Sequence, residues 1–385
     1  MNKRFKKFAF QAHLWLGGIS GIVVFVVCIT GAIWAIGIHN WLGTNEQPTK
    51  IEAEGKSFLA PSVILEQLKN SHHIESPNSI SYTPNEESTI RVYNDSTSLM
   101  LKVNPYTADV TELKDYNSSE YEMSFWDYMR WGHRALWLPW DTGRMIVNYG
   151  TLLFLIVLIS GLILWVPKSR KGLKNRLTLN WTKTTKAKRK FYDLHLVLGF
   201  YASFLLIIIC ATGMVWGLSW WSEATYKVTT GKSLPPWGAI KSTPDPNAII
   251  ATASQADKLD ILFYQTIENN PQMESFSISI SQADTTPFEV RVNNDRSVLY
   301  NYDTYNYNYD SLDLIEAQGY NTGKYEDKSF GEKLRRQNYD LHIGRIWEPV
   351  GEVLIFFAAL FGASLPLTGY YILFVVKRRG RKKTK

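Results

Sequence analysis

The sequence predicts an integral membrane α-helical protein, with a four-helix transmembrane bundle built from two parallel repeats and two small extracytoplasmic α+β domains. Three observations lead to this prediction: four long apolar runs without charges, basic residues gathered beside those runs, and a similarity between the two halves of the chain. Each run is longer than the ~20 apolar residues that an α-helix needs to cross a hydrocarbon core. The chain is therefore expected to be a multi-pass membrane protein.

The distribution of charge sets the expected orientation. The net charge is +7, and half of the 42 basic residues lie in three segments without acids, 3–7, 168–190 and 377–385. The rest of the chain holds the other 21 basic residues and all 35 acidic ones, a balance of −14, which argues against a nucleic-acid partner. Under the positive-inside rule both termini and the central loop are cytoplasmic, and the two long segments between helices are extracytoplasmic.

The expected organisation alternates membrane helices with outer segments. The first run is too long for a signal-peptide core and no small-residue cleavage site follows it, so it is predicted to remain as a helix. The expected parts are transmembrane helix 1 (1–39), outer domain 1 (40–142), transmembrane helix 2 (143–167), a basic cytoplasmic loop (168–191), transmembrane helix 3 (192–221), outer domain 2 (222–348), transmembrane helix 4 (349–376) and a basic cytoplasmic tail (377–385).

Each outer segment shows one helix-like stretch followed by alternating, strand-like runs. In the first segment the helix is expected over 60–70 and the strands over 79–82, 89–93 and 98–103. In the second segment the helix is expected over 246–256 and the strands over 274–280, 288–292 and 297–302. The stretch 104–109 is expected to end the first strand ladder, and the Asn/Tyr-rich stretch 300–309 to form an exposed strand and turn.

An internal repeat relates the two halves. At an offset of 182, His13 aligns with His195 and the run Cys-Ile-Thr-Gly at 28–31 aligns with Cys-Ala-Thr-Gly at 210–213. The second and fourth helices correspond with a one-residue slip, which aligns His133 with His342. Two helix–domain–helix units related by a pseudo-two-fold axis along the membrane normal are therefore expected. The only two cysteines fall inside predicted helices, which excludes a disulfide framework.

Four of the seven histidines occupy equivalent places at helix ends. His13 and His195 are expected near the cytoplasmic face, and His133 and His342 at the outer face. One histidine near a helix end is usually an interfacial or hydrogen-bonded residue, but two symmetry-related pairs in a bundle favour a cofactor site. Four glycines are expected at the same two depths, either to leave room beside a flat cofactor or to allow close helix packing. They are Gly31 and Gly213 at the outer level, and Gly161 and Gly369 at the inner level.

Two histidines per level favour haem over zinc, because zinc normally takes further Cys, His or carboxylate ligands, whereas a porphyrin supplies four of the ligands itself. The sequence has no Cys-x-x-Cys-His, so two b-type haems are predicted, held by His13 with His195 and by His133 with His342. His39 is an alternative ligand at the outer surface, although the repeat places Trp221 at its position. His72 and His73 are expected to be surface residues.

These residues resemble a known family, the PepSY-associated transmembrane-helix proteins, also called iron-regulated membrane proteins, which include ferric-siderophore reductases. The similarity lies in FQAHLWLG at 10–17, GHR at 132–134, SGLILWVP at 160–167, YDLHLVLG at 192–199 and LHIGR at 341–345. The run NPYTAD at 104–109 resembles the end of a PepSY domain, whereas the second outer domain departs from that pattern. The resemblance implies a bacterial plasma (inner) membrane protein with two haems and PepSY-like outer domains, and reduction of siderophore-bound iron as in its relatives.

The leading functional hypothesis is transmembrane electron transfer that reduces an extracytoplasmic acceptor, a ferric siderophore or another ferric chelate, from Fe(III) to Fe(II). The sequence lacks a Gly-x-Gly-x-x-Gly fingerprint, and the central loop is too short for a flavin or nicotinamide domain, so a separate cytoplasmic or quinol donor is expected. A siderophore or solute permease is one alternative. A non-catalytic PepSY sensor or protease-modulating membrane protein is the other.

Overall fold

The computed structural model describes residues 2–43, 49–53, 55–74, 76–94, 97–119, 121–167, 173–236 and 238–376. The expected basic tail (377–385) and the start of the basic loop (168–172) lie outside the described residues. The chain forms two compact units, which we call the helical unit (Met1–Asn45, Met123–Thr225 and Asn338–Lys385) and the sheet unit (Glu46–Glu122 and Tyr226–Gln337).

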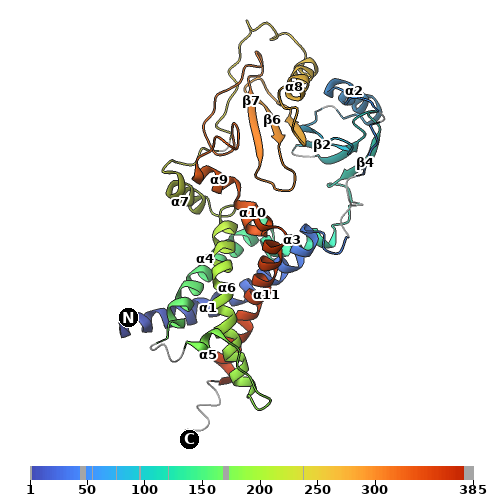
Figure 1. The fold of residues 1–385 in the computed structure, drawn as a ribbon. Helices are drawn as coiled ribbons and strands as arrows, with labels where there is room; N and C mark the ends of the chain where they lie inside the picture. Colours follow the sequence, from blue (N-terminus) through green and yellow to red (C-terminus); the bar gives the residue numbers. More distant parts are fainter. Residues whose placement is uncertain are drawn as a thin grey trace. The chain divides into compact units, whose positions relative to one another are not determined.

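Four long helices dominate the helical unit (Figure 1). They are α1 (Lys3–Ile38), α4 (Trp140–Trp165), α6 (Ala187–Met214) and α11 (Val350–Tyr370), the last continuing as a π-helical segment (Tyr371–Val376). Within the part of the chain that the structure describes, all four are long and apolar enough to cross a membrane, as expected. Shorter helices in this unit are α3 (Phe125–Ala135), α5 (Lys174–Leu177), α10 (Asn338–Ile343) and the 3₁₀ turn η2 (Arg345–Trp347).

The third membrane helix begins and ends earlier in the chain than the sequence indicates. It was expected over 192–221, but α6 ends at Met214, and after a turn a separate helix α7 (Ser219–Thr230) begins. Gly217, in that turn, lies so close to the Asn148 side chain that a Cβ atom there would overlap it. The apolar composition continues through this break, so hydropathy alone does not locate it.

The four long helices form a ring. α1 packs along α4 and α11, and α6 packs along the same two helices, so α1 and α6 are diagonal to each other. Small residues permit the close contacts: Gly150 meets Val23, and Gly21 meets Tyr370, whose hydroxyl donates to the Gly18 carbonyl at 2.8 Å. Side chains from α1 and α6 therefore meet across the centre of the bundle.

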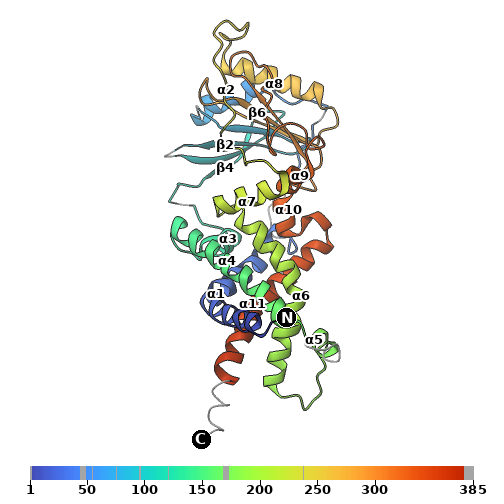
Figure 2. The same cartoon turned by 90° about the vertical axis from the view of Figure 1, so that its left-hand side faces the viewer.

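The sheet unit contains one seven-stranded antiparallel sheet in the order β4-β3-β2-β1-β5-β6-β7. Its strands are β1 (Ser79–Tyr82), β2 (Ser88–Tyr93), β3 (Ser98–Val103), β4 (Val110–Asp115), β5 (Ser275–Ser279), β6 (Phe288–Asn293) and β7 (Tyr302–Tyr307). Helices α2 (Pro61–His72) and α8 (Gln255–Asn269) lie side by side on the sheet (Figure 2). Leu68 of α2 and Phe263 of α8 join the inward side chains of the strands in one apolar core. The remaining helix of this unit is α9 (Phe330–Arg336).

The two outer segments, expected as separate small domains, share this one sheet. β1 from the first segment pairs with β5 from the second, with Ile80 opposite Ile278 and Tyr82 opposite Phe276. The two apolar pairs are buried. Each first strand would otherwise expose an unpaired edge, and the pairing of β1 with β5 removes both edges.

Several local expectations about the sheet unit are wrong. The second helix covers Gln255–Asn269 rather than 246–256, because Ser254 and Asp257 form a capping box at its start. The ladder of the first segment does not end at 104–109, since those residues form a turn that leads into β4. The last strand is β7, not 297–302, and the stretch 300–309 is not an exposed strand, because Thr304 and Asn306 within it are buried.

Candidate functional site

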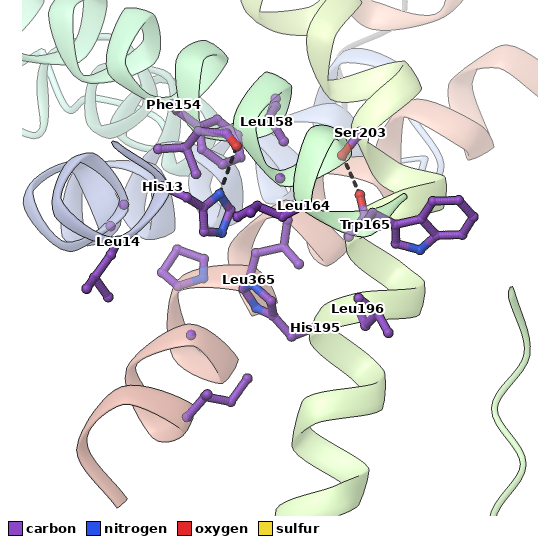
Figure 3. Close-up of a pocket in the computed structure, with 18 of the residues that line it drawn as sticks. His13, Leu14, Phe154, Leu158, Leu164, Trp165, His195, Leu196, Ser203 and Leu365 are labelled. Carbon is purple, nitrogen blue, oxygen red and sulfur yellow. Dashed lines mark hydrogen bonds between the residues drawn. The ribbon is translucent and has the colours of Figure 1, made fainter. Parts of the chain in front are cut away.

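The inner histidine pair lies across the diagonal of the bundle. His13 projects from α1 and His195 from α6, and their ring centres are 6.1 Å apart with an angle of 84° between the ring planes. Both rings line a cavity of about 480 Å³ with mostly apolar walls, and Figure 3 shows them facing this cavity from two different helices. The structure thus brings together two histidines that are far apart in the sequence.

The outer pair has a similar arrangement. His133 belongs to α3 and His342 to α10, two short helices that precede the membrane helices α4 and α11. The ring centres are 6.3 Å apart, the planes are inclined by 57°, and both rings line a second cavity of about 300 Å³. Burial lowers the pKa of both side chains, that of His342 to about 3 with a further contribution from His133. Both imidazoles are therefore neutral, as metal ligation requires.

Hydrogen bonds fix the tautomer of the two histidines from the first half of the chain. Nδ1 of His13 lies 3.0 Å from the Val157 carbonyl oxygen, and Nδ1 of His133 lies 2.8 Å from the Val27 carbonyl oxygen. A carbonyl oxygen only accepts, so each Nδ1 carries the hydrogen and donates it. The lone pair of each ring is consequently on Nε2.

The two histidines from the second half use threonine hydroxyls instead. Nδ1 of His195 lies 2.9 Å from Thr368 Oγ1, and Nδ1 of His342 lies 2.9 Å from Thr212 Oγ1. Each threonine hydroxyl already donates to a carbonyl of its own helix, at 3.0 Å for Thr368 and 2.7 Å for Thr212. Each hydroxyl oxygen therefore accepts from the histidine, which again leaves the lone pair on Nε2. Metal-binding histidines are held in this way by an acceptor at the other nitrogen.

The four predicted glycines each lie against one histidine ring. A Cβ atom at Gly31 would lie 2.7 Å from His133 Nδ1, and one at Gly213 would lie 3.0 Å from His342 Cε1. At Gly161 it would lie 3.1 Å from His13 Cε1, and at Gly369 it would lie 3.4 Å from His195 Cε1. The imidazole rings take the space beside these glycines, and Gly161 and Gly369 line the inner cavity together with Gly17 and Gly199.

The spacing of the ring centres would let both imidazoles of a pair bind one metal ion. A metal–nitrogen bond of about 2 Å, with the nitrogen about 1.1 Å from its ring centre, places two opposed ring centres roughly 6.2 Å apart. The observed separations are 6.1 and 6.3 Å. Among the described residues no group of three His, Cys, Asp or Glu side chains could hold a metal ion. Each pair therefore fits a group that needs only two protein ligands, such as a bis-histidine haem.

The structure does not place His39 as a ligand. Its Nδ1 lies 2.5 Å from Glu352 Oε1, and its Nε2 lies 3.1 Å from the Ile343 carbonyl oxygen. Both ring nitrogens are thus engaged by protein groups. His72 and His73 are exposed at the end of α2, as expected.

Sequence reasoning missed the hydroxyl groups beside the histidines and two arginines at the outer cavity. Thr212 and Thr368 directly precede the predicted glycines Gly213 and Gly369, and this pattern indicates the two hydroxyl acceptors. Arg134 and Arg144 line the outer cavity, and the Arg134 guanidinium lies 4.6 Å from the centre of the Trp140 ring. Burial and the charges of Arg130 and Arg144 lower the pKa of Arg134. The sequence offered one indication of this group: Arg134 directly follows the predicted ligand His133.

Comparison with known families identifies the chain. The PepSY-associated TM region matches residues 10–377, which is nearly the whole length. None of the curated proteins compared with the chain matches it. The chain belongs to the family of proteins that contain the PepSY-associated transmembrane region.

Proposed function

We propose that this protein binds two b-type haems and carries electrons across a membrane to a ferric siderophore or another ferric chelate. The observation that carries the proposal is the geometry of the two histidine pairs. Each pair is spaced for one metal ion, and all four rings donate Nδ1–H to a protein acceptor. When bound, the haems would supply one-electron carriers at two depths of the bundle.

The protein residues would bind and orient these groups. Val157, Val27, Thr368 and Thr212 hold the four rings with Nε2 available for iron, and the acceptors at Nδ1 increase the basicity of the ligand nitrogens. The glycines let the rings lie close to the neighbouring helix backbones. The apolar walls of both cavities would exclude water from the bound groups.

The proposed orientation follows from the charge pattern. The basic residues of 3–7, 168–190 and 377–385 would face the cytoplasm of a bacterial cell, and the sheet unit would be extracytoplasmic at its plasma membrane. The repeat belongs to the same proposal, since one histidine of each pair comes from each half of the chain. Electrons would come from a cytoplasmic or quinol donor.

Ferric iron suits this arrangement as the acceptor. Reduction of Fe(III) to Fe(II) weakens its binding by hard oxygen ligands, so one electron delivered to a ferric chelate releases the metal. The acidic balance of −14 outside the basic segments favours neutral or cationic chelates over strongly anionic ones, an effect that added salt would weaken.

Haem content tests the first part of the proposal. Full-length protein purified in detergent should contain two haems per chain in a pyridine haemochrome assay, all extractable by acidic acetone. His13→Ala or His195→Ala should remove or convert one haem, and His133→Ala or His342→Ala the other, as resolved by reductive titration. A ratio well below one haem per chain in fresh protein would refute the proposal.

Anaerobic reoxidation tests the acceptor. Reduced protein mixed with a ferric siderophore should return to the oxidised spectrum while a ferrous chelator traps one Fe(II) per electron lost. His133→Ala should stop the reoxidation and leave the inner site reducible. If fully loaded protein stays reduced with every ferric chelate, the reductase activity is wrong and only haem binding remains.

A further inference from the structure

The outer cavity carries two positive side chains that come from different helices. Arg134 is the last but one residue of α3 and Arg144 lies in the first turns of α4, and both line the cavity that His133 and His342 share. The lining residues of this cavity, all within the described part of the chain, include no Asp or Glu. The wall is therefore positively charged on balance.

Among the residues that the structure describes, Arg134 and Arg144 form no ion pair with an acid. Nε of Arg144 is buried without a hydrogen-bond partner in the described structure. The Arg134 guanidinium lies over the ring of Trp140 rather than against a carboxylate. Arg134 is exposed, but leaving the buried Nε of Arg144 unpaired is costly, and two like charges at one cavity repel each other. An anionic ligand in the cavity would relieve both costs.

The inner cavity differs in this respect. Arg176 is the charged residue among its described lining residues, and its guanidinium donates to the backbone carbonyls of Leu164 and Trp165 at the end of α4. Both bonds come from Nη1, so backbone oxygens satisfy part of this guanidinium. The inner cavity thus has one arginine among its lining residues, whereas the outer cavity has two.

We propose that Arg134 and Arg144 bind the two carboxylates of the haem held by His133 and His342. This inference rests on the proposed function. Haem carries two carboxylates on one edge, and arginine is the side chain best suited to carboxylates because its planar fork donates two parallel hydrogen bonds. The arginines and the histidine pair line the same cavity, so one molecule can satisfy both.

The affinities of the protein for haem and for haem dimethyl ester are compared, which separates carboxylate binding from a general effect of positive charge. The ester keeps the iron and the ring but lacks both negative charges. Full-length protein with His13→Ala, expressed without haem, isolates the outer site for equilibrium titration. The ester should bind roughly 10- to 100-fold more weakly than haem, since charge-assisted hydrogen bonds are lost. With Arg134→Gln and Arg144→Gln added, the two ligands should bind about equally.

The ratio of the two affinities is the decisive quantity, because differences in ligand solubility cancel between protein variants. Arg130→Gln is the matched control: Arg130 lies one turn earlier on α3, is half exposed, and pairs with Asp127 at 3.0 Å. It should leave the ratio unchanged. An unchanged ratio in the double variant would overturn the assignment, and release of bound anionic lipid from that variant would show that a lipid phosphate holds the arginines.

The readout also separates this inference from the proposed function. If the His13→Ala protein does not fold, the wild-type chain is titrated instead, up to two equivalents of ligand per chain. This titration gives the ratio of the haem and ester affinities for both sites together. Failure of wild-type protein to bind haem would refute the proposed function. Haem binding with equal affinity for the ester would refute only the role of Arg134 and Arg144.

Discussion

Nδ1 of His195 lies 2.9 Å from Oγ1 of Thr368, a hydroxyl whose own hydrogen is already donated to the backbone of α11. The threonine therefore acts as an acceptor and fixes which ring nitrogen of His195 carries hydrogen. His342 depends in the same way on the hydroxyl of Thr212. Substitutions of such acceptors are the most direct tests of the candidate sites.

Thr368→Val should weaken haem binding at the inner site by roughly 10- to 100-fold, the usual effect of losing an acceptor behind a metal-bound histidine. The side chain keeps its shape, but Nδ1–H of His195 loses its partner. Thr266→Val is the matched control, since Thr266 is buried in α8 of the sheet unit and its hydroxyl donates to the carbonyl of Leu262 in the same helix. Affinity is measured by haem titration, and equal losses in the two variants would contradict the role of Thr368.

Gly31→Ala should remove the outer haem. The new methyl group would lie 2.7 Å from Nδ1 of His133, so the ring must leave its hydrogen bond to the Val27 carbonyl. Ile19→Ala, on the same helix, alters a 67% exposed side chain that lines neither cavity and should retain both haems. Haem per chain and the reductive titration report the result, and full retention of the outer haem by Gly31→Ala would show that His133 is not held where we place it.

His39→Gln should leave the haem content unchanged. Both nitrogens of His39 are bound by protein groups, the Glu352 carboxylate and the Ile343 carbonyl. His133→Gln, treated identically, should lose one haem. The pyridine haemochrome assay decides between the two histidines, and a loss of haem from His39→Gln with the helices intact would make His39 the outer ligand.

Arg336→Lys should destabilise the sheet unit by roughly 2–4 kcal/mol. The buried Arg336 guanidinium donates to the carbonyls of Tyr302, Tyr320, Thr322 and Gly323, and a lysine cannot reach all four. Arg296→Lys is the control, because that partly exposed arginine pairs with Glu86 and should contribute less than about 1 kcal/mol. Hydrogen exchange of the β7 amides in the full chain measures the loss of stability in each variant. Similar exchange rates in the two variants would contradict the prediction.

The membrane part of the fold could be predicted because its chemistry is local. An uncharged apolar run is sufficient to indicate each of the four helices, and strands such as Ser79–Tyr82 and Ser88–Tyr93 show clear alternation. The pairing of β1 with β5 was not predictable in this way. It joins residues about two hundred positions apart, such as Ile80 and Ile278, and no local pattern specifies which strand edges will meet.

The candidate sites, like the fold, could be predicted from the sequence only in part. The alignment of the two halves indicated His13 with His195 and His133 with His342, and the structure brings both pairs together. The acceptors at Nδ1 were missed because a backbone carbonyl such as that of Val157 has no mark in a sequence. The two arginines of the outer cavity were missed because a basic residue near a helix end is expected at any membrane surface.

Each histidine pair takes one ring from each half of the chain, so each site is a joint product of both halves. His13 and His133 precede the central loop, whereas His195 and His342 follow it, and β1 and β5 are divided in the same way. Neither half alone can assemble a two-histidine site or close the middle of the sheet. A chain interrupted during synthesis before α6 would thus carry two solitary histidines and an open sheet edge, so a ligand that requires both histidines of a pair would bind only after synthesis and assembly are complete.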